Sequence, residues 1–509
     1  MMASKILSAA VVGLDGAIVE VEAEIVPGSL GTFVIVGLPD AAVQESRERV
    51  RSAVINSGRN FPNKKIAVNL APADLKKQGP SYDLPIAISI LKACDWIDFN
   101  TDVNSREIFI GELALDGRVR PVSGILPIAI AAKKMGIKKM YVPVQNANEA
   151  KLVDGIEVMP VTSLEKLIAH LEGKEIIEPL KNSSFQFHDI ETVYDMAHVR
   201  GQEHAKRALE ISAAGAHNIL MSGPPGSGKT LLARTIPSIL LKLTLPEALE
   251  ITKIYSVAGK LPEDDSLINI RPFRSPHHTA SGAALVGGGT WPRPGEISLA
   301  HRGVLFLDEF SEFPRVMLEN LRQPLEDGVI HISRAAGSLQ FPAKFILVAA
   351  MNPCPCGFNS DPQRHCSCTP QQLLNYQKKI SGPILDRIDL HLEVPRINFD
   401  KLNEDQKGES SLVIRQRIEQ ARKVQQERLQ VYNILVNSEM SSNMVKEFCR
   451  LEADSVQLVR SAVERLHLSA RSYYRILKVA RTIADLSEEK NILTPHVAEA
   501  LQYRQVVNG

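Results

Sequence analysis

A glycine-rich run that ends in lysine and threonine is the strongest chemical signal in this chain. Residues 223–230 (GPPGSGKT) match the pattern G-x-x-x-x-G-K-[ST], after an apolar strand pattern and before a helical one. In that setting backbone N–H groups turn toward phosphates, Lys229 reaches the outer phosphates, and the Thr230 hydroxyl ligates Mg²⁺. The alternative is a chance glycine-rich turn. The residues expected to bind ATP and Mg²⁺ are Gly223, Pro224, Pro225, Gly226, Ser227, Gly228, Lys229 and Thr230.

Two carboxylates end a second apolar strand pattern, residues 304–309 (VLFLDE). Ligands of open α/β sheets lie beyond the carboxyl ends of the strands, so both carboxylates are expected near the phosphates. Asp308 would complete the Mg²⁺ shell, and Glu309 would orient or deprotonate the attacking water. Two acids at a strand end are also common at solvent-exposed termini, and it is the phosphate loop upstream that favours the catalytic interpretation.

Two further polar residues extend this prediction. Asn352 ends a third apolar strand pattern (FILVAAMN), and its amide could fix the same water, or it could simply initiate the Asn-Pro turn. Arg387 lies among apolar residues, and an arginine can stabilise the charge of a transferring γ-phosphate from a neighbouring subunit. In that case the active unit is a ring. The alternative is an ion pair with Asp386 or Asp389.

Four of the six cysteines crowd into one stretch as two Cys-x-Cys pairs. Four thiolates in a short loop can close a tetrahedral Zn²⁺ shell, although this spacing is tighter than the usual Cys-x-x-Cys. The alternative is a reduced, metal-free or redox-sensitive loop. The predicted ligands are Cys354, Cys356, Cys366 and Cys368.

The chain that must position these residues has an ordinary globular composition. Its 509 residues correspond to about three domains. Lysine plus arginine (59) and aspartate plus glutamate (58) nearly cancel, so a nucleic-acid partner would need a local basic patch. Runs of about 18 apolar residues are lacking, so we expect no membrane-spanning helix. With so few cysteines, the expected location is the reducing cytoplasm.

Changes of pattern along the chain predict an α/β protein with several domains. Residues 1–173 mix alternating and helical patterns, including strands at 17–25 and 65–70 and a helix at 85–93, and 174–195 read as a polar linker. Residues 196–397 contain the apolar strands of a parallel sheet and the cysteine-rich loop 354–368. Strand patterns then vanish, and 398–509 are expected to form a helical lid that begins with one long helix over 411–435.

With these motifs in hand, the chain resembles an AAA+ ATPase of the magnesium-chelatase-like group typified by the ComM/YifB proteins, over nearly its whole length. The residues that carry the resemblance, besides the phosphate loop and LFLDE, are 199–202 (VRGQ), 271–278 (RPFRSPHH), 294–303 (PGEISLAHRG), 322–326 (RQPLE), 352–357 (NPCPCG) and 469–475 (SARSYYR).

The resemblance implies a homo-hexameric ring with ATP at the subunit interfaces. It implies that Asn352 is sensor one, Arg387 the arginine finger acting in trans, and Arg471 sensor two, while Val199 and Gln202 line the adenine pocket. The alternative for Arg471 is an ordinary exposed helix arginine. A basic stretch before LFLDE, with Arg271 and Arg274, is similar to the helix-two insertion of this group and is a candidate DNA-contacting segment.

Residues 330–341 (IHISRAAGSLQF) read as a hairpin with Gly337 near its tip, similar to the hairpin that precedes sensor one in ring helicases. Arg334 and Ser338 near this tip would contact DNA phosphates in a central pore. The alternative is a solvated hairpin without a special role.

The N-terminal segment resembles the Lon-type protease domain, with Gly79-Pro-Ser81 at the nucleophile loop and residues 111–124 before the general base. Where that family carries its lysine, this chain has Ile125-Leu126-Pro127, and leucine cannot accept the serine proton. We therefore expect an inactive peptidase fold, unless Lys133 or Lys134 is a displaced base.

Three functions follow from these expectations. The first is an ATP-driven ring motor on DNA, a branch-migration helicase in recombination or natural transformation. The second is a magnesium-chelatase-type motor subunit, although no metal-binding partner domain is recognisable in the sequence. The third is a protein unfoldase coupled to proteolysis, which the missing lysine disfavours. The fold alone cannot choose among the three.

Overall fold

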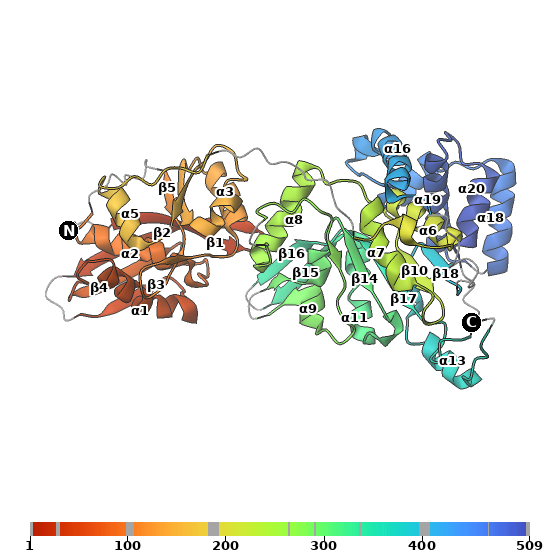
Figure 1. Ribbon diagram of the computed structural model, residues 1–509, viewed down its shortest axis with the longest axis horizontal. Coiled ribbons are helices and arrows are strands. Elements are labelled where there is room, and N and C mark those ends of the chain that lie inside the picture. The colour runs from red at the N-terminus through yellow and green to blue at the C-terminus, as the bar shows by residue number, and fades with distance from the viewer. Residues whose placement is uncertain are drawn as a thin grey trace. The chain divides into compact units, whose positions relative to one another are not determined.

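A computed structural model divides the chain into two compact units (Figure 1). The first comprises Met1–Phe187 with Leu245–Ile268, and the second His188–Thr244 with Asn269–Gly509. The residues that the structure describes are 4–26, 31–97, 106–181, 193–262, 265–289, 292–334, 337–359, 361, 363–396, 408–466 and 468–504. Half of the predicted linker, residues 182–192, therefore lies outside the described residues.

The first unit is built on a seven-stranded mixed sheet with the order β3-β4-β2-β1-β5-β8-β9. Its strands, with the small β6–β7 ribbon, are β1 (Ser4–Val12), β2 (Asp15–Val26), β3 (Phe33–Val36), β4 (Lys65–Ala71), β5 (Glu107–Phe109), β6 (Glu112–Leu113), β7 (Val119–Arg120), β8 (Lys139–Pro143) and β9 (Glu157–Val161). Its helices are α1 (Ala41–Asn56), α2 (Asp83–Ala93), α3 (Ile125–Lys134), α4 (Ala147–Ala150), α5 (Leu164–Leu171) and α8 (Leu245–Ala258), with a 3₁₀ turn η1 (Pro80–Tyr82).

Sequence periodicity explains the central strands and helix of this sheet. In β2 the apolar residues Val19, Val21 and Ala23 are fully buried, and the glutamates between them are not. Helix α2 is almost wholly apolar and nearly every residue in it is buried. These elements confirm the strands predicted at 17–25 and 65–70 and the helix predicted at 85–93.

Helix α8 belongs to the first unit although its sequence lies beyond the phosphate loop. The Ser256 hydroxyl donates to the buried Glu149 carboxylate, and the backbone N–H of Gly124 donates to the Ser256 carbonyl at 3.1 Å. Glu149 also accepts the N–H of Leu126 at 2.8 Å, and burial raises its pKa. The 245–268 segment is thus built into the amino end of α3, which the sequence pattern did not indicate.

The second unit contains a five-stranded parallel sheet with the order β11-β14-β17-β10-β18. Its strands are β10 (Ile219–Ser222), β11 (Phe273–Arg274), β14 (Val304–Leu307), β17 (Ile346–Met351) and β18 (Leu390–Glu393), and two separate ribbons pair β12 (Gly287–Gly288) with β13 (Arg293–Pro294) and β15 (Val329–Arg334) with β16 (Gly337–Pro342). Every residue of β10 and β14 is buried, as expected for a sheet covered on both faces.

Helices cover this sheet and form the C-terminal region (Figure 1). Those associated with the core are α6 (Glu203–Gly215), α7 (Lys229–Ile239), α9 (Gly282–Val286), α10 (Glu296–Leu299), α11 (Arg315–Glu319), α12 (Arg322–Asp327), α13 (Pro370–Gln377) and α14 (Gly382–Leu385), with 3₁₀ turns η3 (Met196–His198) and η4 (Phe310–Glu312). The C-terminal helices are α16 (Ser411–Leu429), α17 (Ser442–Phe448), α18 (Ala453–Leu466), α19 (Ala470–Leu486) and α20 (Thr494–Gln502), with 3₁₀ turns η5 (Gln430–Tyr432) and η6 (Asn437–Glu439).

Several predicted elements of this unit are confirmed and one is wrong. The hairpin expected over 330–341 is the β15–β16 ribbon, in register from Val329↔Pro342 to Arg334↔Gly337. The long helix expected to reach residue 435 ends at Leu429, because the chain continues as the 3₁₀ turn η5 and Asn433 then adopts a left-handed conformation. Among the described residues, no helix is long and apolar enough to cross a bilayer.

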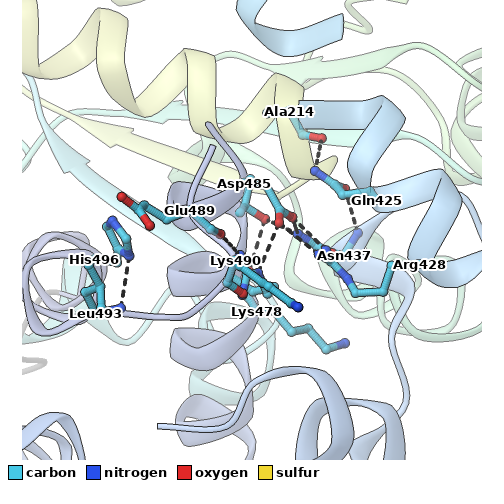
Figure 2. Close-up of polar contacts among 12 residues, drawn as sticks. Ala214, Gln425, Arg428, Asn437, Lys478, Asp485, Glu489, Lys490, Leu493 and His496 are labelled. Carbon is cyan, nitrogen blue, oxygen red and sulfur yellow. Dashed lines mark hydrogen bonds and ion pairs between the residues drawn. The ribbon is translucent and has the colours of Figure 1, made fainter. Parts of the chain in front are cut away.

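A buried polar network joins the C-terminal helices to helix α6 beside the five-stranded sheet (Figure 2). Asp485 on α19 accepts from Arg428 on α16 at 2.7 Å and from Asn437 at 2.8 Å. Gln425 extends the network, since it donates to the Ala214 carbonyl at the end of α6 and accepts the Asn437 N–H. The network therefore fixes three C-terminal elements against a helix that flanks the sheet.

We expect Asp485→Ala to destabilise the second unit. Asp485 also accepts from Arg481 at 3.0 Å, so its removal leaves two largely buried guanidinium groups without their carboxylate. Unpaired buried charges cost about 3–5 kcal/mol, which urea unfolding of the full chain would measure. Glu464→Ala, at an exposed position on α18, is the matched control and should change the unfolding free energy by less than about 0.5 kcal/mol. Equal urea concentrations at the unfolding midpoints of the two variants would contradict the expectation.

Candidate nucleotide-binding site

The phosphate loop joins the buried strand β10 directly to the amino end of α7. Gly226 (φ +77°) and Gly228 (φ +87°) adopt left-handed conformations that other residues rarely take. Gly223 lies against the neighbouring strand, because a Cβ there would come within 2.2 Å of the Val394 carbonyl oxygen. The loop therefore has the backbone that a phosphate-binding turn at a helix N-terminus requires.

Lys229 is buried and folded back over this loop. Its ammonium donates to the carbonyls of Gly223 (2.7 Å) and Pro224 (2.9 Å) and to Asn352 Oδ1 (3.4 Å). Desolvation lowers its pKa, and Asp308 opposes that shift. Phosphate oxygens are charged and are stronger acceptors than carbonyls, so a bound triphosphate would draw the ammonium toward itself.

Two carboxylates follow β14 at the same edge of the sheet as the loop, as the sequence predicts, and Asp308 contacts the loop. Thr230 Oγ1 donates to Asp308 Oδ2 at 3.0 Å, which pairs the two groups expected to hold Mg²⁺. The other Asp308 oxygen accepts the Glu309 N–H at 2.9 Å. Glu309 has φ +50°, a strained conformation for a residue with a side chain, and its side chain is 58% exposed. An exposed carboxylate in a fixed backbone can act on a water molecule.

The structure adds His278 to this group. Its Nδ1 lies 3.0 Å from Glu309 Oε2. The centroid of its ring lies 4.2 Å from that of His277 and 6.3 Å from that of Phe313. The sequence drew attention to residues 271–278 only as part of a signature, and no spacing rule links residue 278 to residue 309. His278 is therefore placed to orient the Glu309 carboxylate.

Asn352 follows β17 and joins the same group, as predicted. Besides its amide contact with Lys229, its backbone carbonyl accepts the Tyr376 hydroxyl at 3.1 Å. Tyr376 lies on α13 and in turn accepts from Ser311 at 2.6 Å, in the turn after Glu309. Tyr376 thus ties the ends of β14 and β17 together, a role that the sequence did not indicate.

Arg387 lies at the opposite edge of the sheet from the phosphate loop. It precedes β18, which runs parallel to β10, and its carbonyl accepts from Asn218 at 3.3 Å, immediately before β10 begins. The buried Arg387 side chain forms an ion pair with Glu326 on α12, instead of the partners Asp386 or Asp389 that the sequence offered.

Arg471 reaches the same carboxylate. The helix start predicted at this point is confirmed, because Ser469 caps α19. The half-exposed Arg471 Nη2 lies 3.1 Å from Glu326 Oε1, and the neighbouring Arg475 pairs with the buried Asp389. Arg387 and Arg471 together hold the pKa of Glu326 below its ordinary value, with Arg387 the larger cause. Two predicted phosphate-contacting arginines therefore converge on one acidic side chain.

The residues expected to line the adenine pocket lie beside the end of β18. Val199 is buried, and Gln202, in a left-handed conformation before α6, donates to the Pro395 carbonyl at 2.6 Å. These positions adjoin the phosphate loop because Gly223 packs against Val394. A role in binding adenine stays a prediction.

The candidate DNA-contacting residues differ in their surroundings. Arg271 donates to the carbonyls of Leu241 (2.6 Å) and Arg302 (2.8 Å), and Arg274 forms a two-pronged pair with Glu296. These guanidinium groups thus link the edge strand β11 and the residues before it to neighbouring loops and to helix α10. Ser338 is exposed on the hairpin, and the side chain of Arg334 lies outside the described part of the structure.

Four sulfurs gather beyond Asn352 into one group, the four-cysteine cluster (Cys354, Cys356, Cys366 and Cys368), as the sequence predicts. Their Sγ atoms all lie within 4.8 Å of one another. The backbone N–H of Phe358 is the largest of several hydrogen bonds that lower the pKa of the Cys356 thiol to about 5. A thiolate is the form of cysteine that binds metal.

The first unit contains the loop of Ser81, but it has no basic side chain at the position where the Lon-type family carries its lysine. Ser81 lies in the 3₁₀ turn η1, and Ile125, Leu126 and Pro127 are buried in the first turn of α3. Lys133 and Lys134 are exposed at the other end of that helix. Loss of peptidase activity stays a prediction.

Comparison with known proteins identifies relatives over the whole chain. It is 45% identical to competence protein ComM of Haemophilus influenzae over 99% of this chain and 97% of that protein. It is 44% identical to YifB of Escherichia coli, an uncharacterized protein, over 99% and 98% of the two chains. Lon protease of Rhizobium meliloti is 30% identical over 31% of this chain and 20% of its own. The family described as magnesium chelatase, subunit ChlI, matches residues 195–402, and its related segments match 21–146 and 408–504.

We expect Glu309→Gln to bind nucleotide and to lose turnover. The amide retains the shape of the side chain but cannot accept a proton from water, and general-base catalysis contributes roughly 10²–10⁴-fold. Lys229→Ala, by contrast, should lose nucleotide binding itself. Fluorescent-nucleotide titration and phosphate release distinguish the two outcomes.

The matched control is Glu312→Gln, one turn further along, where the carboxylate pairs with Lys379 at 2.9 Å and should not affect turnover. Hydrolysis by Glu309→Gln at the native rate would remove Glu309 from the role of base.

Proposed function

The chain belongs to the ComM/YifB family of magnesium-chelatase-related proteins, and on this premise we propose that it is an AAA+ ATPase that works as a ring motor on DNA. The observation that carries the proposal is the separation of two half-sites on one sheet. Lys229, Asp308 and Asn352 meet at the carboxyl edge of the strands, and Arg387 lies at the amino edge. A complete hydrolytic site then needs two copies of the chain.

The arginine pair makes the second half-site specific for an anion. Arg387 and Arg471 converge on the half-exposed Glu326 from separate elements, a loop of the sheet and the first turn of α19. A γ-phosphate from a neighbouring subunit is an anion like that carboxylate and accepts the same kind of charge-assisted hydrogen bonds. We therefore assign both arginines, sensor two as well as the finger, to the nucleotide of the neighbour.

A closed ring follows from this head-to-tail arrangement. An interface that joins two different surfaces of the same chain generates a ring where the rotation closes. The proposed assembly is a homo-hexamer, as the family resemblance implies. Its cofactors are ATP and Mg²⁺, held by Lys229, Thr230 and Asp308, together with a structural Zn²⁺ in the four-cysteine cluster.

DNA is the proposed substrate, and branch migration during recombination or natural transformation the proposed activity. The name of the Haemophilus relative, competence protein, supports this choice. The β15–β16 hairpin precedes β17 and Asn352 and so could transmit nucleotide-dependent movement, and Ser338 and Arg334 are its candidate phosphate contacts. Arg271 and Arg274 are weaker candidates, since backbone carbonyls and Glu296 already occupy their guanidinium groups.

Two other motors remain as alternatives. A magnesium-chelatase-type motor subunit agrees with the family match over residues 195–402, and a protein unfoldase agrees with the Lon-like first unit. The buried Ile125-Leu126-Pro127 turn disfavours an unfoldase coupled to its own proteolysis.

We expect four-way or forked DNA to stimulate ATP hydrolysis strongly. Because phosphate contacts release counterions, the stimulation should fall steeply between about 50 and 200 mM salt, and duplex DNA of equal length is the control substrate. Steady-state phosphate release measures this response. No response to DNA, with stimulation by an unfolded protein, would favour the unfoldase instead.

We also expect Arg387→Ala and Lys229→Ala to restore each other's activity when the two variants are mixed. Each alone lacks one half of every site, whereas random mixing produces about one intact interface in four. Phosphate release after mixing and reassembly measures the recovery, and Arg471→Ala, at a half-exposed position, serves as a second partner for Lys229→Ala. Failure of both mixtures to recover would place these arginines outside the neighbour's site.

A further inference from the structure

The four-cysteine cluster has the dimensions of a tetrahedral metal site. The Sγ atom of Cys354 lies 3.3 Å from that of Cys356 and 3.7 Å from that of Cys366, and the last two are 3.6 Å apart. The Sγ atom of Cys368 lies within 4.8 Å of all three. Zinc–sulfur bonds of about 2.3 Å in a tetrahedron put neighbouring sulfurs about 3.8 Å apart. Small adjustments of these side chains would therefore close a four-thiolate shell.

Backbone N–H groups donate hydrogen bonds to sulfurs of this cluster, but these bonds are weak and hold the arrangement only loosely. Thiols donate and accept only weak hydrogen bonds, and all six cysteines of the chain are free of disulfides. Cys354 is fully buried and the other three are half-buried, so a bound ion would be largely shielded from water. A zinc–thiolate centre contributes folding free energy directly to such a loop.

The cluster is attached to the nucleotide site on one side. Cys354 follows Asn352 by two residues, and Gly357 donates its N–H to the Cys354 carbonyl at 3.0 Å. Gly357 (φ +85°) packs so closely on the phosphate loop that a Cβ there would lie 2.7 Å from Pro225 Cδ and 3.9 Å from Asn352 Cγ. The turn that carries the first sulfur pair therefore contacts both the phosphate loop and the sensor asparagine.

On its other side the cluster is attached to the end of β18. Asp361, whose side chain is fully buried, pairs with Arg396 at 3.0 Å, and Arg396 lies over the Phe358 ring at 5.6 Å. The second sulfur pair leads into the capping box of Thr369 at the start of α13, the helix that carries Tyr376. The loop thus connects three elements that surround the phosphate loop.

We propose that the four-cysteine cluster binds one Zn²⁺ and that this centre holds Asn352 and the phosphate loop in the geometry needed for ATP turnover. The proposal rests on the nucleotide site of the proposed function and extends it. Binding fixes the first sulfur pair against the second. Because the first pair lies in the same turn as Gly357, the contact of that turn with Pro225 and Asn352 is fixed as well. The cysteines are positioning residues, since they would act on the phosphate loop and Asn352 through the turn of Gly357.

Metal content of the full-length chain purified under reducing conditions tests the first half. We expect about one zinc per chain, because a complete four-thiolate shell takes one ion. Replacement by Co²⁺ should give the intense thiolate charge-transfer and visible bands of tetrahedral sulfur coordination. A chain without metal, together with a cobalt form that lacks those bands, would overturn the site.

A ligand variant tests the second half. Cys366→Ser with Cys368→Ser removes the sulfur pair that does not touch the phosphate loop, and Cys94→Ser in the first unit is the matched control. We expect the double variant to lose zinc and its kcat without DNA to fall about 10- to 100-fold, because small misplacements of reacting groups have costs of that order. Its nucleotide affinity should change far less, since Lys229 and the loop glycines remain. The control should retain zinc and kcat.

Cys366→His separates positioning from folding, because imidazole is also a zinc ligand. This variant should retain zinc and recover most of the turnover that the double serine variant loses, even where the double variant proves unstable. A zinc-free double variant with native kcat, or a zinc-loaded histidine variant without turnover, would overturn the positioning role. These assays contain no DNA. A wild-type chain whose ATP hydrolysis does not respond to DNA would therefore refute the proposed substrate, but the effect of the cysteine variants on kcat could still be interpreted.

Discussion

The common direction of β10, β14 and β17 is the constraint on which the rest of this molecule depends. Because the three strands are parallel neighbours, their carboxyl ends meet at one edge and bring together the phosphate loop, the Asp308–Glu309 pair and Asn352. The same direction puts the residues that precede β18 at the other edge. One topological fact thus gathers the candidate nucleotide-binding residues and separates them from Arg387.

Glu326 pairs with both of the arginines that we propose to act on the nucleotide of a neighbouring subunit. A buried guanidinium without a partner would be costly, and Arg387 has its carboxylate in the same chain. Arg471 shares that carboxylate from a helix of the C-terminal region. A half-exposed acid thus keeps two guanidinium groups together, and in the proposed ring an incoming phosphate would take over this cationic pair.

The membership of helix α8 in the first unit is unexpected from its place in the sequence. It follows the helix that begins with Lys229, yet its Ser256 is bonded to Glu149 and Gly124 of the first unit. The amino end of α3, where a related protease would carry its base, is instead occupied by packing and by the buried Glu149. The first unit, which resembles a peptidase, thus binds a helix whose sequence lies beyond the phosphate loop.

Local signals in the sequence determined the parts whose chemistry is written in consecutive residues. The phosphate loop, the acidic end of β14, the hairpin before β17 and the cysteine pairs each follow from spacing or alternation within one short segment, and the structure contains all of them. Side-chain partners distant in sequence could not be read in this way. The pairing of His278 with Glu309, the sharing of Glu326, the bridge made by Tyr376 and the placement of α8 join residues that are brought together only when the sheet and its helices pack. A linear pattern specifies which face of an element is buried, whereas its neighbour is decided by the free energy of the whole packed unit.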